Sequence, residues 1–500
     1  MDLTRLAAED PGKAAVLDAE TGEQISYGEL EARSNRIAHA LRRRGLVPGS
    51  HLAVLSPNTL DLFPVVWAAQ RSGLLHTPVN WHLAADEATY IVENCEAMLL
   101  VHDDSLAELA ASIAAATGVP LLTFAALEAE AATEPATPIG DQAEGYYMFY
   151  SSGTTGRPKG ILPELPNAPF GTGLQLDHMM AGYFGFGPDT VYLSPGPMYH
   201  AAPMGWSFGA LRNGGTVVML PRFDAELALQ AIEQYDVTHG QFVPTMFVRM
   251  LKLAHDQRAA YDVSSLQVVI HAAAPCPIEV KEQMIAWFGP KLLEYYSGSE
   301  GAGFFMIDSA AWANHKGSVG QSVFGVPHVL DDDGAELPTG EIGQIWFSGS
   351  APFEYHGDAE KTAGAYNDRG WSTLGDLGHL DEDGFLYLSD RRTDLILSGG
   401  VNIYPREIED VLVLHPDVDD VAVIGVPDAE FGQSVHAVIQ PAPGVSLDGL
   451  DGRISEFLRE RIAGFKVPRS FAFGEVPRLP SGKVLRRHLM KSYSERPQQR

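Results

Sequence analysis

The chain has few cysteines and few basic residues. Its 500 residues include only two cysteines, Cys95 and Cys276, which lie too far apart in the sequence to suggest a metal-ligand cluster or a disulfide framework. We expect Cys276, which stands between two prolines, to be a buried or half-buried thiol. Lysine and arginine total 35 against 64 acidic residues, so the formal net charge is −29. This balance argues against a nucleic-acid or anionic-membrane partner.

Long apolar runs are also missing. No stretch of about 18 apolar residues free of charges and breakers occurs, which predicts that the chain has no transmembrane segment. The chain begins Met1-Asp2-Leu3-Thr4-Arg5, without the apolar core of a signal peptide, so we expect a cytoplasmic protein. Its length exceeds that of a simple domain and predicts two or more structural units.

What the chain does have is a loop rich in glycine and hydroxyl groups, Tyr150-Ser-Ser-Gly-Thr-Thr-Gly-Arg-Pro-Lys159-Gly160. Glycine lets backbone N–H groups turn toward one point, and hydroxyls add further donors there. Lys159 can neutralise negative charge, so the loop is typical of a polyphosphate site. It lacks the GK[ST] ending and the glycine spacing of the common mononucleotide loop. A flexible Gly/Ser loop without a ligand is the alternative.

The first half of the chain alternates short β-like runs with helical patterns, which predicts parallel α/β layering. Strands are expected at 51–56, 75–79, 97–102 and 121–124, and helices at 60–71, 83–94 and 106–116. Residues 125–145, rich in Ala, Glu, Thr and Pro, predict an exposed connector. A second α/β stretch over 190–298 has expected strands at 216–220, 241–244 and 267–272.

From about residue 340 the pattern becomes shorter and more β-like, with turns at Asp333-Gly334 and Asp383-Gly384. The charged break Asp390-Arg-Arg-Thr-Asp394 precedes a compact αβ segment with helices expected near 405–414 and 447–462. The predicted fold class is α/β. A large N-terminal domain, residues 1–390, would combine layered α/β subdomains with a β-rich subdomain, and a small α+β C-terminal domain would follow.

Four further motifs follow the glycine-rich loop in the chain. They are Tyr295-Tyr-Ser-Gly-Ser-Glu300-Gly301, Gly370-Trp-Ser-Thr-Leu-Gly-Asp376, Leu397-Ser-Gly-Gly400-Val-Asn-Ile-Tyr-Pro405-Arg-Glu-Ile-Glu409 and Leu479-Pro-Ser-Gly-Lys483-Val-Leu-Arg-Arg487. Taken singly, each could be a turn or a solvated surface. In this order, and over nearly the whole chain, they resemble the adenylate-forming superfamily: acyl- and aryl-CoA synthetases, firefly luciferase and peptide-synthetase adenylation domains. The resemblance is closest to the acyl-CoA synthetases.

The resemblance implies a two-step reaction that uses ATP, Mg²⁺ and CoA. A carboxylate attacks the α-phosphorus of ATP to give acyl-AMP and pyrophosphate, and a thiol, usually that of CoA, then displaces AMP. It also implies that the C-terminal domain, residues 395–500, is a mobile lid that rotates about a hinge at 391–394 and carries the catalytic lysine. The implied partners are a small-molecule carboxylic acid, ATP and CoA, and a homodimer is left open.

The resemblance assigns a role to each matching residue. Those implied to be catalytic are Lys483, Glu300, His200 and Lys159. The implied ATP or AMP site comprises Ser151, Ser152, Gly153, Thr154, Thr155, Gly156, Lys159, Ala273, Ala274, Tyr295, Tyr296, Ser297, Ser299, Asp376, Arg391 and Lys483. Glu300 would bind Mg²⁺, with Ser151 completing its shell. Tyr296 would lie against adenine, and the single carboxylate of Asp376 can accept hydrogen bonds from both ribose hydroxyls.

The resemblance also implies an acid pocket and a CoA site. The pocket residues would be His200, Ala201, Met204, Gln241, Ala272 and Ser297, and several small side chains suggest a bulky apolar acid: fatty, aromatic or polycyclic. The CoA residues would be Ser398, Gly399 and Gly400 at the pantetheine tunnel and Lys466 and Arg469 at the phosphates. The alternatives are a structural histidine at 200 and ordinary surface cations at 466 and 469.

Three positions depart from the common family pattern. Ser297 stands where glycine is frequent, which puts the shape of the acid pocket in doubt. Leu374 precedes Gly-Asp where a polar residue is frequent, and Thr393 occupies the expected hinge position. None of the three removes a catalytic group.

The leading functional hypothesis is an ATP-dependent carboxylic acid–CoA ligase. An enzyme that stops at acyl-AMP or loads a carrier protein, and a catalytically silent nucleotide-binding regulator, remain as alternatives. An amino-acid-activating domain is disfavoured because 197–206 contains no acidic residue to pair with an ammonium group. The pattern Gly205-Trp-Ser207-Phe-Gly209 suggests a serine hydrolase, but 195–203 holds three prolines and predicts a loop where that nucleophile needs a strand.

Overall fold

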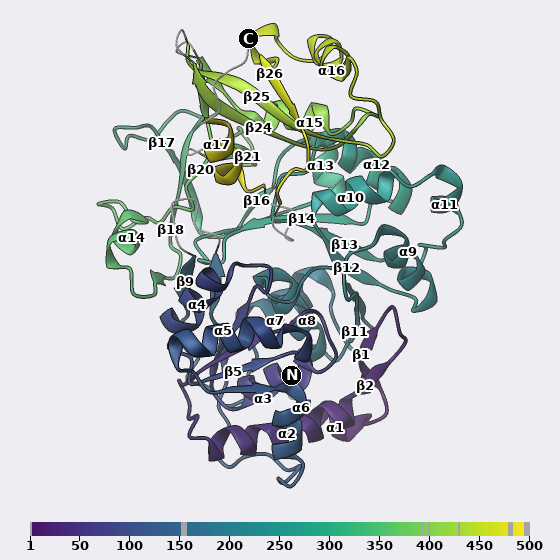
Figure 1. Ribbon diagram of the computed structural model, residues 1–500, viewed down its shortest axis with the longest axis vertical. Coiled ribbons are helices and arrows are strands. Elements are labelled where there is room, and N and C mark those ends of the chain that lie inside the picture. The colour runs from purple at the N-terminus through teal and green to yellow at the C-terminus, as the bar shows by residue number, and fades with distance from the viewer. Residues whose placement is uncertain are drawn as a thin grey trace. The chain divides into compact units, whose positions relative to one another are not determined.

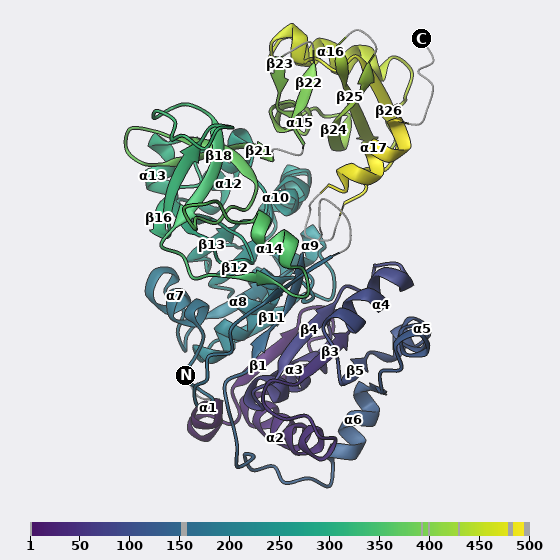
Figure 2. The ribbon, with the colours of Figure 1, turned by 90° about the vertical axis from the view of Figure 1, so that its left-hand side faces the viewer.

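The computed structural model (Figures 1 and 2) describes residues 3–151, 158–391, 394–398, 401–428, 431–478 and 484–494. The chain forms two compact units, each built from several segments. The first contains Met1–Phe242, Leu253–Ile270 and Pro352–Gly364, and the second contains Val243–Lys252, His271–Ala351 and Ala365–Arg500. The α/β class expected from the sequence is confirmed, because helices alternate with parallel strands through most of the first unit.

The first unit contains a parallel five-stranded sheet. Its strand order is β6-β5-β3-β4-β7, formed by β3 (His51–Leu55), β4 (Leu75–Val79), β5 (Leu99–His102), β6 (Leu121–Thr123) and β7 (Tyr146–Tyr147). The helices between and around these strands are α2 (Tyr27–Arg43), α3 (Leu62–Arg71), α4 (Ala85–Asn94), η1 (Asp104–Leu106), α5 (Ala107–Thr117) and α6 (Phe124–Ala131). Buried residues of α4 and α5 pack on β3, β4 and β5, so these two helices cover one face of the sheet.

The first unit also contributes six strands, in the order β13-β12-β10-β11-β1-β2, to a nine-stranded sheet. They are β1 (Ala14–Asp18), β2 (Gln24–Ser26), β10 (Val191–Ser194), β11 (Thr216–Met219), β12 (His239–Phe242) and β13 (Val268–His271). The helices of this region are α1 (Leu3–Glu9), α7 (Gln175–Phe184), α8 (Ala201–Arg212), α9 (Ala225–Gln234) and α11 (His255–Ala259). A small sheet, β19-β9-β8, joins β8 (Phe149–Ser151), β9 (Lys159–Leu162) and β19 (Glu354–Tyr355), and α14 (Ala359–Gly364) follows it.

The second unit begins with α10 (Pro244–Leu251) and contains two antiparallel groups of strands before residue 392. The strands β14 (Leu292–Ser297), β15 (Phe304–Asp308) and β16 (Gln321–Phe324) pair in that order, beside α12 (Ile278–Phe288) and α13 (Ser309–Asn314). The other sheet has the order β17-β18-β20-β21, formed by β17 (Val326–Leu330), β18 (Gly343–Ser348), β20 (Asp376–Leu380) and β21 (Leu386–Arg391). This is the β-rich part that the short turns predict.

The remainder of the second unit forms around a long hairpin of β24 (Val418–Asp428) and β25 (Gly432–Pro441). The other elements are β22 (Ile396–Ser398), β23 (Val401–Ile403), α15 (Pro405–Leu412), α16 (Leu450–Arg459), η2 (Gly464–Lys466), β26 (Ser470–Phe473) and α17 (Arg486–Ser494). Alternate residues of β24 point to opposite faces. Val421 and Val423 pack with α15 and α16, whereas Ala422 and Ile424 pack with Leu489 of α17.

Two local signals explain where helices begin. Ser26 caps α2 through a reciprocal pair, in which Glu29 N donates to Ser26 Oγ at 3.2 Å and Ser26 N donates to Glu29 Oε2 at 2.9 Å. Pro244 and Pro405 stand in the first turn of α10 and α15, where a missing N–H group has no cost.

Three expectations about secondary structure are wrong. The stretch 125–145 was expected to be an exposed connector, but α6 (Phe124–Ala131) occupies its first part and buries Phe124, Leu127 and Ala131. Alanine favours helix, these three residues share one helical face, and Thr123 caps the helix by accepting from Ala126 N at 3.0 Å. The strand expected at 241–244 ends at Phe242 because Pro244 starts α10. The loop expected over 195–203 ends earlier, because α8 already begins at Ala201.

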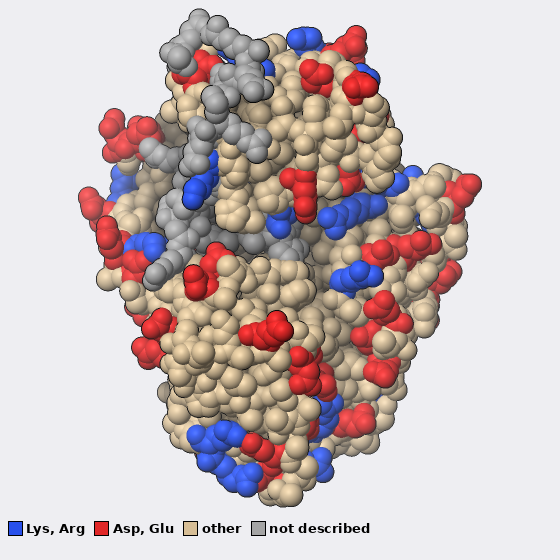
Figure 3. Space-filling model, in the orientation of Figure 1, with Lys and Arg blue, Asp and Glu red and all other residues tan. Residues whose placement is uncertain are grey.

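Both cysteines are buried, as expected for Cys276, and burial raises the pKa of each thiol. No helix in the part of the chain that the structure describes has both the length and the apolar character needed to span a bilayer. Acidic side chains are spread over the face shown in Figure 3 and alternate there with scattered basic ones.

Candidate active site

Tyr296 and Asp376 form a direct pair in the second unit. Tyr296 lies near the end of β14 and Asp376 is the first residue of β20, and the Tyr296 hydroxyl donates to Asp376 Oδ2 at 2.6 Å. The Tyr296 ring also lies 5.9 Å from that of Phe305 and 6.5 Å from that of Phe347, measured between centroids. The aromatic ring expected against adenine is therefore joined to the carboxylate expected at the ribose.

Arg391 belongs to the same group through backbone pairing. Asp376 of β20 stands opposite Arg391 of β21 in the antiparallel register. Directly opposite residues in such a pair have Cβ atoms about 5 Å apart, so both positions face the same region. The structure thus brings together the positions of Tyr296, Asp376 and Arg391, although the Arg391 side chain lies outside the described part.

A tight loop after β14 holds Ser299 and Glu300. Ser297 Oγ donates to Gly303 O at 2.7 Å, which closes the loop. A Cβ atom at Gly298 would lie 2.6 Å from the Leu374 side chain and 2.8 Å from Glu300 Oε2, so a larger residue there would displace both side chains. Ser299 is exposed and Glu300 is half-buried. The hydroxyl of Ser297, which departs from the family pattern, is thus engaged by the loop's own backbone.

The segment after β13 contains a strained residue. Ala272 is buried, whereas Ala273 is exposed and has φ of 73°, in the left-handed region. For a residue other than glycine this conformation costs about 1–2 kcal/mol, and such strain persists where surrounding structure or function demands it. Ala274, which follows, is half-buried. Tyr295, on the neighbouring strand β14, stacks on Phe304 with centroids 5.2 Å apart.

A buried polar cluster supports β13 and β14, and no sequence signal pointed to it. Lys281 of α12 donates to Glu294 Oε2 at 2.6 Å, and its Nζ lies 4.8 Å from the centroid of the Trp312 ring. His271 Nε2 lies 3.7 Å from the same Glu294 oxygen. Desolvation raises the pKa of Glu294 and lowers that of His271. The cluster ties α12 to β14, the strand that carries Tyr296, and to the last residue of β13, which precedes Ala272.

In the first unit, Lys159 is the first residue of β9. Its Nζ lies 4.7 Å from the centroid of the Tyr355 ring. Gly160 is closely packed, because a Cβ atom there would lie 2.8 Å from the Tyr150 ring. Ser152, Gly153, Thr154, Thr155 and Gly156 lie outside the described residues, as does the side chain of Ser151. Their assignment to the phosphate loop stays a prediction.

His200 precedes α8 directly and is neutral at physiological pH. Burial lowers the pKa of its imidazole to about 4. Its Nε2 atom is buried and has no hydrogen-bond partner among the described residues. Ala201 and Met204, two further residues of the predicted acid pocket, lie in the first turn of the helix, and Met204 N donates to His200 O at 3.2 Å. Gln241 is buried on β12, where its Oε1 accepts from Tyr192 at 3.5 Å.

The same helix excludes the serine hydrolase hypothesis. Ser207 is buried inside α8, and its hydroxyl donates to Ser194 Oγ at 3.0 Å. A nucleophile elbow places serine on an exposed turn between strand and helix, which this residue does not occupy.

The expected CoA residues of the C-terminal region have partners of their own. Lys466 Nζ donates to both carboxylate oxygens of Glu407, at 2.5 and 2.6 Å. The Arg469 guanidinium lies 3.8 Å from the centroid of the Phe431 ring. Ser398 ends β22, opposite Val401. Gly399, Gly400 and Lys483 lie outside the described residues, so the CoA site and the catalytic lysine stay predictions.

Comparison with known proteins places the chain in a family. The chain matches the AMP-binding enzyme family over residues 3–354 and the AMP-binding enzyme C-terminal domain over 407–483. A feruloyl-CoA synthase of an Amycolatopsis species is 34% identical over 480 residues, which cover 94% of each chain. A fatty acid–[acyl-carrier-protein] ligase of Streptomyces coeruleorubidus is 32% identical over 506 residues, covering 97% of this chain and 94% of that protein. ATP-bound MatB from Rhodopseudomonas palustris has a similar structure, with a TM-score of 0.82 and 29% identity over 99% of both chains. The chain therefore belongs to the AMP-binding enzyme family.

Proposed function

We propose that the protein is an ATP-dependent carboxylic acid–CoA ligase that forms acyl-AMP and pyrophosphate and then acyl-CoA and AMP. The observation that carries the proposal is that both family models match this one chain, with Lys483 inside the C-terminal match. The joined positions of Tyr296, Asp376 and Arg391 support it, since a nucleoside needs an aromatic surface and a carboxylate for its ribose. A silent regulator would have no need of Lys483.

The first step brings a carboxylate against a polyphosphate, so it needs cations and donors. Lys159 and the hydroxyls of its loop would bind the β- and γ-phosphates, and Lys483 would bridge the attacking carboxylate and the α-phosphate. Mg²⁺ would be held by Glu300. A single carboxylate is enough for this, because Mg²⁺ is bound through one or two carboxylates together with phosphate oxygens of the substrate. Bound there, Mg²⁺ would neutralise charge on the leaving pyrophosphate.

A direct test of the metal ligand is Glu300→Ala. We expect the variant to need a higher magnesium concentration and to release pyrophosphate more slowly, because the carboxylate proposed to bind Mg²⁺ is gone. An unchanged magnesium titration would remove Glu300 from this role. The half-buried position of Glu300 makes a folding defect small, which thermal unfolding would verify.

The chemistry around His200 favours a bulky apolar acid. The imidazole is held neutral by burial, and Met204 in the first turn of α8 is fully buried, so this region offers little to a small polar acid. The relative that is a feruloyl-CoA synthase, at 34% identity, points the same way. We therefore propose an aromatic or fatty acid as the substrate class.

The decisive experiment measures pyrophosphate release over a panel of carboxylic acids, with and without CoA, and identifies the products by mass spectrometry. The ligase proposal expects release with an apolar acid and acyl-CoA when CoA is present. Absence of release with every acid would overturn it in favour of a silent regulator.

A second candidate is loading of an acyl carrier protein. It is favoured by the 32% identical relative, which is named a fatty acid–[acyl-carrier-protein] ligase. Replacing CoA with a carrier protein that bears a phosphopantetheine arm separates the two. Transfer to the carrier with none to CoA would identify this second function.

A further inference from the structure

The ends of the segment that carries Lys483 are held together by backbone contacts. Arg478 and Val484 face each other in an isolated antiparallel bridge, and Leu485 N donates to Pro477 O at 2.8 Å. Val484 is the residue directly after Lys483. The residues on either side of 479–483 therefore lie side by side in the described structure.

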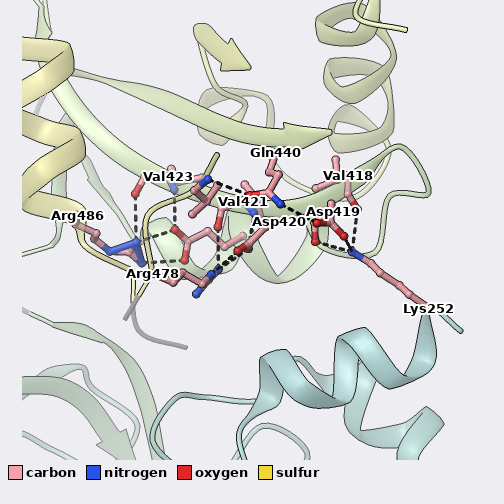
Figure 4. Close-up of polar contacts among 11 residues, drawn as sticks. Lys252, Val418, Asp419, Asp420, Val421, Val423, Gln440, Arg478 and Arg486 are labelled. Carbon is pink, nitrogen blue, oxygen red and sulfur yellow. Dashed lines mark hydrogen bonds and ion pairs between the residues drawn. The ribbon is translucent and has the colours of Figure 1, made fainter. Parts of the chain in front are cut away.

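Arg478, at the first of these points, is tied to β24 by a bidentate ion pair. Its Nε donates to Asp420 Oδ2 at 2.6 Å, and one terminal nitrogen donates to Asp420 Oδ1 at 2.7 Å. That nitrogen also reaches Val421 O at 3.1 Å. Asp420 Oδ1 in turn accepts from Val421 N at 2.7 Å, which holds the carboxylate against its own strand. Figure 4 shows this arrangement.

Arg486, three residues after Lys483, forms a similar bidentate ion pair on the C-terminal side of the lysine. Its two terminal nitrogens donate to Glu409 Oε1 and Oε2 at 2.7 and 2.8 Å, and its Nε donates to Asp394 Oδ2 at 3.2 Å. Glu409 Oε1 also accepts from Val423 N at 2.6 Å. Arg486 thus joins α17 to α15 and to Asp394, the last residue of the expected hinge.

These pairs are less exposed to solvent and share more hydrogen bonds than ordinary surface ion pairs. The side chains of Arg478 and Asp420 are 20% and 17% exposed, and those of Arg486 and Glu409 are both 14% exposed. Two parallel N–H···O bonds fix the orientation of both groups as well as their distance. A more exposed pair in the same region, Arg453 with Asp417, has one bond of 3.0 Å to the carboxylate and exposures of 44% and 29%. The other two nitrogens of Arg453 donate to the backbone carbonyls of Asp448 and Ser446.

We propose that Arg478 with Asp420, and Arg486 with Glu409, are positioning residues that set where the Lys483 ammonium is presented during adenylation. The proposal rests on the proposed function, in which Lys483 meets the carboxylate and the α-phosphate. A lysine reaches its target through a flexible four-carbon stem, so its placement depends on how its backbone is held at both ends. No role for either arginine in contact with substrate is needed.

The test separates the two half-reactions. Adenylation is measured as single-turnover pyrophosphate release, and thioester formation is measured from supplied acyl-AMP and CoA. In Arg478→Ala and Arg486→Ala we expect the adenylation rate to fall about 10- to 100-fold, because small misplacements of a catalytic group are costly. The KM for ATP and the thioester step should stay within about twofold, since they do not depend on the position of Lys483.

Arg453→Ala is the matched control, because it removes an arginine from an ion pair elsewhere in the same region. It should leave both half-reactions unchanged. Asp420→Asn and Glu409→Gln keep the size of the partner and remove its charge, and they decide the matter if an alanine variant does not fold. In each pair, the double variant should be no slower in adenylation than the slower single variant.

Equal loss of both half-reactions, or loss of neither, overturns the positioning role while the ligase stands. A wild-type enzyme that releases no pyrophosphate with any acid overturns the proposed function itself, and with it this proposal. Thermal unfolding of every variant shows whether a lost rate reflects a lost fold.

Discussion

Two sets of arginine–carboxylate pairs differ in what surrounds them. In the first unit, Arg212 is ion-paired with Glu144 and lies 3.6 Å from Asp177, and all three side chains are at most 7% exposed. Its guanidinium lies 5.3 Å from the ring centroid of Trp67. In the second unit, Arg478 and Arg486 form pairs whose side chains are 14–20% exposed on the arginine side. The residue types are the same, but water can reach only the second set.

This difference separates folding from function. A fully buried charge that loses its partner stays in an apolar environment, so such a cluster governs whether the unit folds. A half-buried pair that is broken can be rehydrated, so little folding free energy is at stake. What it controls is the orientation of the chain segments it joins. We therefore expect Arg212 to matter for stability and the second-unit residues to matter for catalysis.

The largest expected effect tests the buried side of the comparison. Arg212→Ala should lower the free energy of unfolding by about 3–5 kcal/mol, because Glu144 and Asp177 are left buried without a cation. Denaturant unfolding measures it. Arg453→Ala, which breaks an exposed pair, should cost less than about 1 kcal/mol. Equal costs for the two variants would contradict the distinction.

The next prediction concerns the reaction rate and not the stability of the fold. Lys483→Ala should slow adenylation by about 10²–10³-fold, since it removes the cation where charge develops, and should largely spare thioester formation from supplied acyl-AMP. Its stability should match that of the wild type. Parallel loss of both half-reactions would show that the lysine does not have this role.

Acidification should lower the free energy of unfolding through His76, which is buried near Arg212. Burial, reinforced by the charge of Arg212, lowers the pKa of His76 to about 3. The unfolded chain binds this proton near pH 6.5 while the folded chain does not, so stability is present above that pH and is lost as pH falls. One such histidine contributes a loss of about 2 kcal/mol at pH 5. His76→Gln should flatten the dependence of unfolding free energy on pH, and an unchanged slope would disprove the buried neutral form.

The smallest expected effect tests the proposed ATP site around Tyr296 and Asp376. Tyr296→Phe removes the hydroxyl that donates to Asp376, so the KM for ATP should rise about tenfold, as for a lost hydrogen bond to a charged group, with little change in kcat. Tyr261→Phe is the control. It also removes a tyrosine hydroxyl that donates to a carboxylate, that of Glu226 at 2.9 Å, but this pair belongs to the first unit. Equal KM values in wild type and Tyr296→Phe would remove this contact from the ATP site.

Much of the candidate site was predictable because its residues stand in short motifs. Tyr296 and Asp376 were assigned to adenine and ribose from motif position, and the structure joins them directly. The helix α6 was missed because alanine and glutamate fit both a helix and a solvated connector, and only packing of Phe124 and Leu127 decides between them. The cluster of Lys281 and Glu294 left no signal, since a lone lysine on a helix predicts exposure.

The sequence by itself determined the order of the motifs and the family they indicate, because loops that bind phosphate, ribose and metal need particular residues within a few positions of each other. Only the tertiary structure decided that Arg478 meets Asp420 across 58 positions and that Arg212 meets Glu144 across 68. The physical reason is that an ion pair depends on distance and burial, which arise when separate strands and helices pack together and leave no local trace in the chain.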